Sequence, residues 1–153
     1  MNRGFTLIET LIYIALLAFI MGSGVVAAFY VIDSSEKEKG NIHAISEAAF
    51  LMRKIDWALN NTPQICSPAS GMTESSLLVD QNCSSPINPI LIDLSSERAQ
   101  ITIGGAMSEL TSEWVKIENL QFEHIAVLQK PAAIKASFTA NGKPFEMTKY
   151  LRK

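Results

Sequence analysis

The chain has no proline before Pro63, and between Phe5 and Ile32 its only ionisable acid or base is Glu9, apart from two tyrosines. Helix breakers and charges are therefore both nearly absent from a long apolar run. A basic excess is missing too, since the net charge is -2, and this argues against electrostatically driven binding of nucleic acid. The 153 residues suffice for one modest domain and an anchoring segment.

Sequence motifs of catalysis are also absent, because the chain has no GxSxG, phosphate-binding loop, HExxH or dinucleotide-binding fingerprint. His43 falls in a predicted helix and His124 in a predicted strand, where a structural role explains each better than a role as ligand or base. Asp80, Asp93 and Glu97 lack a calcium-loop pattern and are interpreted as solvated strand ends and turns. We predict that the chain is not an enzyme and holds no metal and no cofactor.

The C-terminus carries the basic residues Lys149, Arg152 and Lys153. They offer a contact for DNA or a phosphate-bearing surface, but a solvated chain end explains them more simply. Nucleic acid is therefore not an expected partner, although the sequence leaves it open.

The cysteines are few, with only Cys66 and Cys83 in the chain. No CxxC or histidine pair accompanies them, so a zinc site is not indicated. In an exported segment they are a candidate disulfide, which would stabilise the fold by about 3 kcal/mol through loop closure. Two unrelated buried thiols are the alternative.

The apolar run covers residues 5–32. As a helix it would be about 42 Å long, more than the roughly 30 Å of hydrocarbon in a membrane. It is too long for the apolar part of a secretory signal, and no small-x-small cleavage site follows it. Arg3 precedes the run, whereas Asp33 and Glu36 follow it. The positive-inside bias thus predicts a single-pass protein of the cytoplasmic (inner) membrane, with its N-terminus in the cytoplasm and its globular part outside.

Glu9 lies near the start of this helix and needs its own explanation. A carboxylate costs about 2.5 to 3.5 kcal/mol at mid-bilayer on insertion scales, and less near the edge. Either the side chain stays at interface depth, where the helix N-terminal dipole favours it, or it meets a cation once the helix enters a packed assembly.

Residues 3–9, which read RGFTLIE before an apolar helix, resemble the class III signal sequence of type IV pilins and type II secretion pseudopilins. The resemblance implies that a prepilin peptidase cuts between Gly4 and Phe5 and methylates the new amine of Phe5. It also implies that Glu9 pairs with this amine in a neighbouring subunit as the filament assembles. Cleavage would then create the cation that a buried carboxylate requires.

The same resemblance implies the partners and the role. Other pilin or pseudopilin subunits, the prepilin peptidase, an inner-membrane assembly platform and the lipid bilayer are expected, and the product is an extracytoplasmic filament. Major pilins of the family usually have a proline within the apolar helix, whereas this chain has Gly22, Ser23 and Gly24 there. These residues either soften the helix or let neighbouring helices approach closely. We therefore expect a minor structural subunit, with a filament-displayed module that binds DNA, a surface or a secreted substrate as the alternative.

The predicted fold class is α+β, with the long N-terminal helix continuing into an amphipathic helix that packs on a C-terminal antiparallel sheet. The expected division is a leader at 1–4, a membrane helix at 5–32, a polar exit and amphipathic helix at 33–62, and a β-rich region at 63–153. The apolar stripe predicted for the amphipathic helix consists of Ile42, Ile45, Ala49, Met52, Ile55 and Leu59.

Alternating apolar residues between Asn, Ser and Pro predict strands at 76–80, 90–94, 100–103, 114–117, 120–125, 134–139 and 145–150. Asn141-Gly142 predicts a hairpin between the last two, and Pro144 indicates a sheet edge or a strand start. Segments 51–56 and 120–122 are in addition similar to J-type minor pseudopilins.

Overall fold

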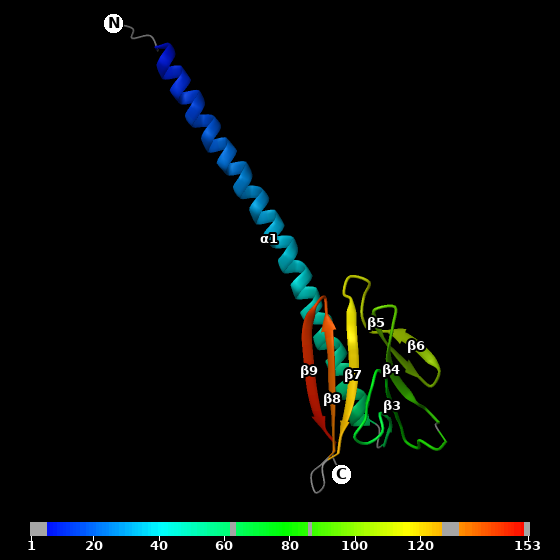
Figure 1. Cartoon of the computed structure of the whole chain (residues 1–153). Helices are drawn as coiled ribbons and strands as arrows, with labels where there is room; N and C mark the ends of the chain where they lie inside the picture. The colour runs from blue at the N-terminus through cyan, green and yellow to red at the C-terminus, as the bar shows by residue number, and fades with distance from the viewer. Residues whose placement is uncertain (1–5, 62–63, 86, 127–131, 152–153) are drawn as a thin grey trace. The chain divides into compact units, whose positions relative to one another are not determined.

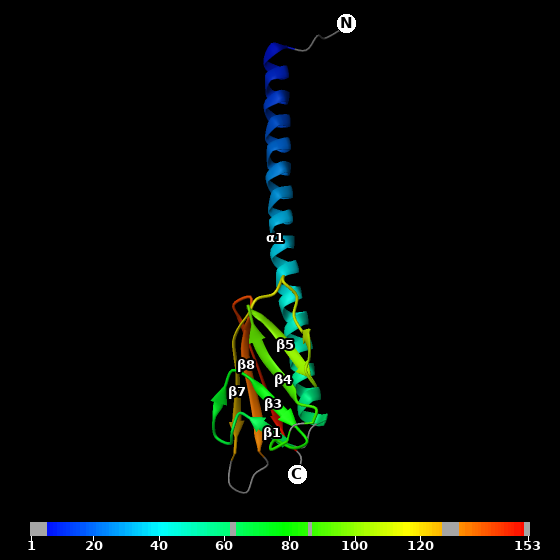
Figure 2. The same cartoon turned by 90° about the vertical axis from the view of Figure 1, so that its right-hand side faces the viewer.

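A computed structural model describes residues 6–61, 64–85, 87–126 and 132–151. It has one helix followed by antiparallel strands, as Figures 1 and 2 show, so the predicted α+β class is confirmed. The elements in chain order are α1 (Leu7–Asn61), β1 (Gln64–Ser67), β2 (Thr73–Glu74), β3 (Leu77–Asp80), β4 (Ile90–Ser95), β5 (Arg98–Ile103), β6 (Ala106–Glu109), β7 (Ile117–Ile125), β8 (Ala133–Ala140) and β9 (Lys143–Tyr150).

The chain divides into two compact units, Met1–Gly40 and Asn41–Lys153. The second unit is called the head below. α1 is helical without interruption through Gly22 and Gly24 and through the charged stretch 33–40. Within that stretch Lys37 Nζ lies 2.8 Å from the Asp33 carboxylate one turn earlier, on an exposed surface where such a pair adds a few tenths of a kcal/mol at most.

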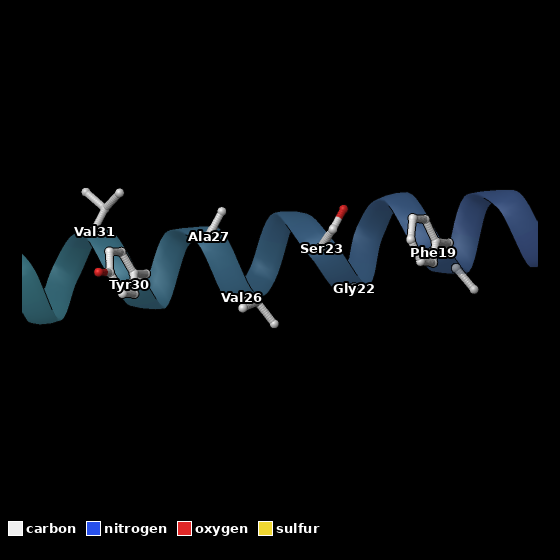
Figure 3. Close-up of a pocket in the computed structure, with 8 residues that line it drawn as sticks. Phe19, Gly22, Ser23, Val26, Ala27, Tyr30 and Val31 are labelled. Atoms are coloured by element: carbon white, nitrogen blue, oxygen red, sulfur yellow. The ribbon is translucent and has the colours of Figure 1, made fainter.

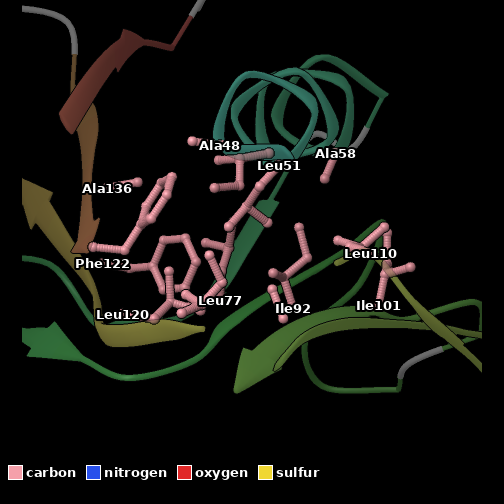
Figure 4. Packing of buried hydrophobic residues seen from close by; sticks show 14 of the residues in the cluster. Ala48, Leu51, Ala58, Leu77, Ile92, Ile101, Leu110, Leu120, Phe122 and Ala136 are labelled. Carbon is pink, nitrogen blue, oxygen red and sulfur yellow. The ribbon is translucent and has the colours of Figure 1, made fainter. Parts of the chain in front are cut away.

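Two antiparallel sheets make up the rest of the head. The first has the strand order β1-β3-β4-β5-β6, and the second has the order β2-β7-β8-β9. β2 follows β1 in the chain but pairs with β7, so the chain crosses from one sheet to the other and back before β3. The final part of α1 covers the inner sides of both sheets, and Figure 4 shows side chains from helix and sheets meeting in one core.

The stripe of α1 that packs on the sheets differs from the predicted one. Ile42 and Ile45 are 64% and 51% exposed, so these two assignments were wrong, whereas Ile55 and Leu59 are buried as predicted. The buried stripe consists of Ala44, Ala48, Leu51, Ile55, Ala58 and Leu59. It lies about a quarter of a turn from the predicted stripe. Alanines let the helix approach the sheets closely, so small side chains rather than the largest apolar ones mark the inner face.

The strand predicted at 114–117 is also wrong except for its last residue. The Val115 N–H donates to the Ser112 carbonyl, which makes a turn, and Trp114 is 77% exposed. The turn is fixed on α1 because Glu47 accepts hydrogen bonds from the backbone N–H (3.0 Å) and the hydroxyl (2.5 Å) of Ser112. The remaining predicted strands are present, and β1, β2 and β6 are additional.

The β8–β9 hairpin turns at Asn141 and Gly142, whose φ angles are +48° and +76°. Both values lie in the left-handed region that Asn and Gly tolerate best, which is why this dipeptide predicted the turn. The Asn141 side chain also accepts a hydrogen bond from the Lys116 N–H at 2.8 Å. Pro144 lies at the start of β9, which is an edge strand.

The β4–β5 turn contacts the second sheet at the start of β7, next to the β8–β9 turn. Ser96 and Glu97 have φ angles of +51° and +63°, although neither is glycine. Contacts with the surrounding residues must hold such a backbone conformation in place. The Glu97 carbonyl accepts a hydrogen bond from the Ile117 N–H at 2.8 Å, and its carboxylate lies 2.8 Å from Lys116 Nζ. The side-chain hydrogen bond between Lys116 and the Glu97 carboxylate, together with the charge of Glu97, raises the pKa of Lys116.

Cys66 in β1 and Cys83 form a disulfide with a Cα–Cα distance of 5.3 Å and a separation of 17 residues. It closes the segment that contains the crossing from one sheet to the other and back. We expect replacement of both cysteines by serine to lower the free energy of unfolding by about 3 kcal/mol, mainly because the unfolded chain gains loop entropy. Thermal unfolding of the full chain in detergent, with and without reductant, measures this. The double variant should be insensitive to reductant, and an unfolding midpoint equal to that of the oxidised protein contradicts the expectation.

Candidate functional site

The first turn of α1 begins immediately after Thr6. The Thr6 carbonyl accepts hydrogen bonds from the backbone N–H groups of Glu9 (3.1 Å) and Thr10 (3.2 Å) and from the Thr10 hydroxyl (3.0 Å). Thr6 therefore stands at the N-cap and Glu9 at the third helical position. Gly4 and Phe5, the predicted cleavage pair, lie outside the described residues.

Glu9 is the acidic residue of this first turn, and its side chain is half-buried. At the third helical position the partial positive charge of the helix N-terminus favours a carboxylate. From Leu11 to Ile32 the helix carries no charged side chain and presents apolar side chains in every direction. An 18-residue window has a mean hydropathy of 2.3, and none of that window is buried within the chain. Length and composition therefore allow α1 to cross a membrane.

One face of this helix is lined by small residues between larger ones, as Figure 3 shows. The residues are Ala18, Phe19, Gly22, Ser23, Val26, Ala27, Tyr30 and Val31. They recur at spacings of three and four, so they form a stripe along one side of the helix. The Ser23 hydroxyl donates to the Ile20 carbonyl at 2.9 Å, which leaves the face apolar. The sequence had singled out Gly22 and Ser23 but not Ala18, Ala27 or Tyr30, which the same spacing identifies.

The glycines of this segment are not required by anything within the described chain. A Cβ atom built at Gly22 or at Gly24 meets no other atom within 4 Å. Room for a side chain therefore exists at both positions in the isolated subunit. A requirement for glycine, if one exists, arises from contacts with other molecules.

The N-terminal segment also matches a known family. Residues 1–25 match the family model described as the prokaryotic N-terminal methylation motif. The chain carries the hallmark motif of type IV pilins and pseudopilins. Comparisons with curated proteins and with solved structures find no match for the chain. The motif indicates a pilin-like prepilin subunit, a structural protein rather than an enzyme, and implies assembly with other pilins and processing by a prepilin peptidase.

The motif and the apolar helix together fit a protein anchored in the membrane by a single span. The motif contains the RGFTLIE segment and the Gly22-Ser23-Gly24 stretch, so both features singled out in the sequence fall within the matched residues. Its boundary at residue 25 leaves the head outside the comparison.

The histidines of the head have structural surroundings. His43 is exposed on α1, and His124 Nδ1 lies 3.0 Å from the Pro68 carbonyl, so the ring holds the loop after β1. The acidic residues differ from one another. Asp80 is buried, which corrects its interpretation as solvated, and accepts a hydrogen bond from the Gln81 N–H, whereas Glu97 is exposed. Within the described ranges, no group of three or more His, Cys, Asp or Glu side chains is placed to hold a metal ion.

The outer side of the β7-β8-β9 sheet has a shallow hollow. Its lining includes the side chains of Asn119, Gln121, Ser137, Thr139 and Glu146, which are amides, hydroxyls and one carboxylate. No cation is among its lining residues in the described part of the chain, so the hollow is not suited to a phosphate group. Of the basic C-terminal residues, Arg152 and Lys153 lie outside the described residues, and Lys149 Nζ lies 2.6 Å from the Asp56 carboxylate on α1.

Proposed function

We propose that the chain is a minor structural subunit of an extracytoplasmic filament of the type IV pilus or type II secretion pseudopilus kind, made as a prepilin and inserted with its N-terminus in the cytoplasm. The observation that carries this proposal is the methylation motif at residues 1–25, with Glu9 in the first turn of an apolar helix. An acidic side chain there is unfavourable in lipid and favourable beside a cation in a packed assembly.

Processing supplies that cation in the proposed pathway. The peptidase cuts between Gly4 and Phe5, transfers a methyl group to the new amine, and leaves a positive charge at the start of the helix. Glu9 of one subunit then pairs with the amine of a neighbour as the helices leave the lipid. The absence of proline before Pro63 supports a minor rather than a major position.

Replacement of Gly4 by valine tests the processing step. A β-branched side chain next to the scissile bond restricts the backbone and crowds the peptidase, so we expect the variant to keep its first four residues and to accumulate in the membrane. The mass of the intact purified protein measures this directly. The wild-type chain should begin at Phe5 and carry one extra methyl group.

Asn2→Ala is the matched control, because it changes the leader without altering the residues at the bond. It should be cleaved like the wild type and should appear in filaments sheared from cells. A wild-type chain that keeps Met1–Gly4 in those filaments would falsify the proposed pathway.

A further inference from the structure

Four strands end a sheet in the described part of the head, and two of them, β6 and β9, have an edge that is open to a further strand. β6 ends its sheet and pairs with β5 alone, and β9 ends the other sheet and pairs with β8 alone. Figure 1 shows β6 and β9 at opposite edges of the head. The other terminal strands are β2, which has only two residues, and β1, which is linked to Cys83 by the disulfide. β6 and β9 are therefore the edges most open to an added strand.

The backbone groups of β6 that point outward follow from one hydrogen bond. The Leu110 N–H, directly after β6, donates to the Ala99 carbonyl at 2.8 Å. Residues of an antiparallel strand direct their N–H and C=O groups to alternate sides. Leu110 and Ser108 therefore direct theirs toward β5, and Met107 and Glu109 direct theirs away from the sheet.

The residues of β9 alternate in the same way. The Leu151 N–H donates to the Ala132 carbonyl at 2.8 Å, so the residues that direct their backbone groups outward are Glu146, Thr148 and Tyr150. Pro144 belongs to the same series but has no N–H, which closes the start of β9 to an added strand. The open part of this edge is its second half.

The two edges run in opposite directions along α1. β6 leads to Ser112, which is hydrogen-bonded to Glu47, whereas β9 leads to Lys149, which is paired with Asp56 later on the same helix. Two heads that lie side by side in the same orientation present these two edges to each other. β6 of one copy and β9 of its neighbour then meet antiparallel, without either copy being inverted.

Each edge also carries one large exposed apolar side chain. Met107 is 65% exposed on β6, and Tyr150 is 66% exposed on β9. If these two residues lie opposite each other, Glu109 falls opposite Thr148, and all four direct their backbone groups toward the partner strand. A methionine beside an aromatic ring is a favourable contact, so the side chains and the backbone groups select the same register.

We propose that β6 of one copy of this chain pairs antiparallel with β9 of a second copy, with Met107 opposite Tyr150 and Glu109 opposite Thr148. The proposal deepens the proposed function, because it names a contact between heads in the assembly. It rests on that function only in requiring two copies with the same orientation. A minor subunit satisfies this, since one pair of copies is enough.

The register places Ser108 opposite Lys149 of the second copy. Ser108 lies on the helix side of its sheet, because its partner Ile101 is buried, and Lys149 faces its own α1 through Asp56. Ser108 and Lys149 both direct their backbone groups away from the new contact, so they form a non-hydrogen-bonded pair, in which the Cα atoms are about 4.5 Å apart. A disulfide fits that distance. Both native cysteines are already joined to each other, so single added cysteines report only the new contact.

Cross-linking in membranes tests the pairing with the full chain. Ser108→Cys and Lys149→Cys are made as separate variants, co-expressed and treated with an oxidant. We expect a cross-linked dimer from the mixture and only background from either variant alone, because the contact joins two different edges. The matched control mixes Ser108→Cys with Thr148→Cys. Thr148 is one residue away and faces the other side of the sheet, so this mixture should give background.

The outcomes separate this proposal from the filament role. Equal cross-linking in both mixtures, or none in a chain that is found in filaments, overturns the edge pairing and leaves the filament role standing. A register-specific cross-link in a chain that never enters filaments supports the pairing and counts against the filament role.

Discussion

Replacement of Glu9 by alanine should leave membrane insertion and processing intact and should remove the subunit from filaments. Alanine is more favourable than glutamate inside a membrane helix, so insertion is not impaired. In a packed assembly, however, the variant leaves the amine of a neighbouring subunit without its counter-charge. Removing one partner of a buried ion pair costs about 3 to 5 kcal/mol, which corresponds to a hundredfold or greater loss of incorporation.

The measurement compares sheared filaments with the membrane fraction by immunoblot. Glu9→Gln has the same size as the wild-type side chain without its charge and should fail like alanine. Glu9→Asp keeps the charge on a shorter side chain and should recover part of the incorporation. Normal incorporation of both uncharged variants means that Glu9 does not pair with the amine, and the interface-depth explanation is then preferred.

Replacement of Phe122 by alanine should have the largest effect on the stability of the head. Phe122 is fully buried in β7, where it lies opposite Ala136 of β8 beneath α1 (Figure 4). Truncation of a buried phenylalanine costs about 3 to 5 kcal/mol, because apolar contacts are lost and a cavity remains. The stability of a domain is about 5 to 15 kcal/mol in total, so this loss is a large part of it. The head of the variant should therefore unfold well below the melting temperature of the wild type.

Thermal unfolding of the full chain in detergent, followed by the circular dichroism of the strands, measures the loss. Trp114→Ala removes a larger aromatic side chain that is 77% exposed, so it should change the free energy of unfolding by only about 0.5 kcal/mol. Similar losses for the two variants contradict the assignment of the core.

The N-terminal site was predictable because its features are local. The RGFTLIE segment and the run without charges are read directly from consecutive residues, and the match over residues 1–25 covers the same segment. The alternation of the longer strands was equally visible, and Asn141-Gly142 identified a turn through its own backbone preferences.

Other parts of the fold depend on partners that are distant in sequence. β6 reads Ala-Met-Ser-Glu, which has neither β-branched residues nor alternation, and it is a strand only because β5 pairs with it. The buried stripe of α1 is set by how closely the sheets approach Ala44 and Ala48. Trp114 and Val115 look like part of a strand, but Glu47 holds the neighbouring Ser112 in a turn. The order and register of the strands likewise require the assembled sheets.

The inner stripe of α1 has a practical consequence for any attempt to study the head without its anchor. Ala44 and Ala48 belong to the hydrophobic core, and Glu47 fixes the loop before β7, so the head is incomplete without this part of the helix. A truncation placed at the start of the strands would remove one wall of the core and expose the apolar side of both sheets. A soluble fragment should therefore begin near Asn41, the first residue of the head and just after the charged stretch 33–40. The part of the helix that it keeps has polar side chains on its exposed face, among them Arg53 and Asn60.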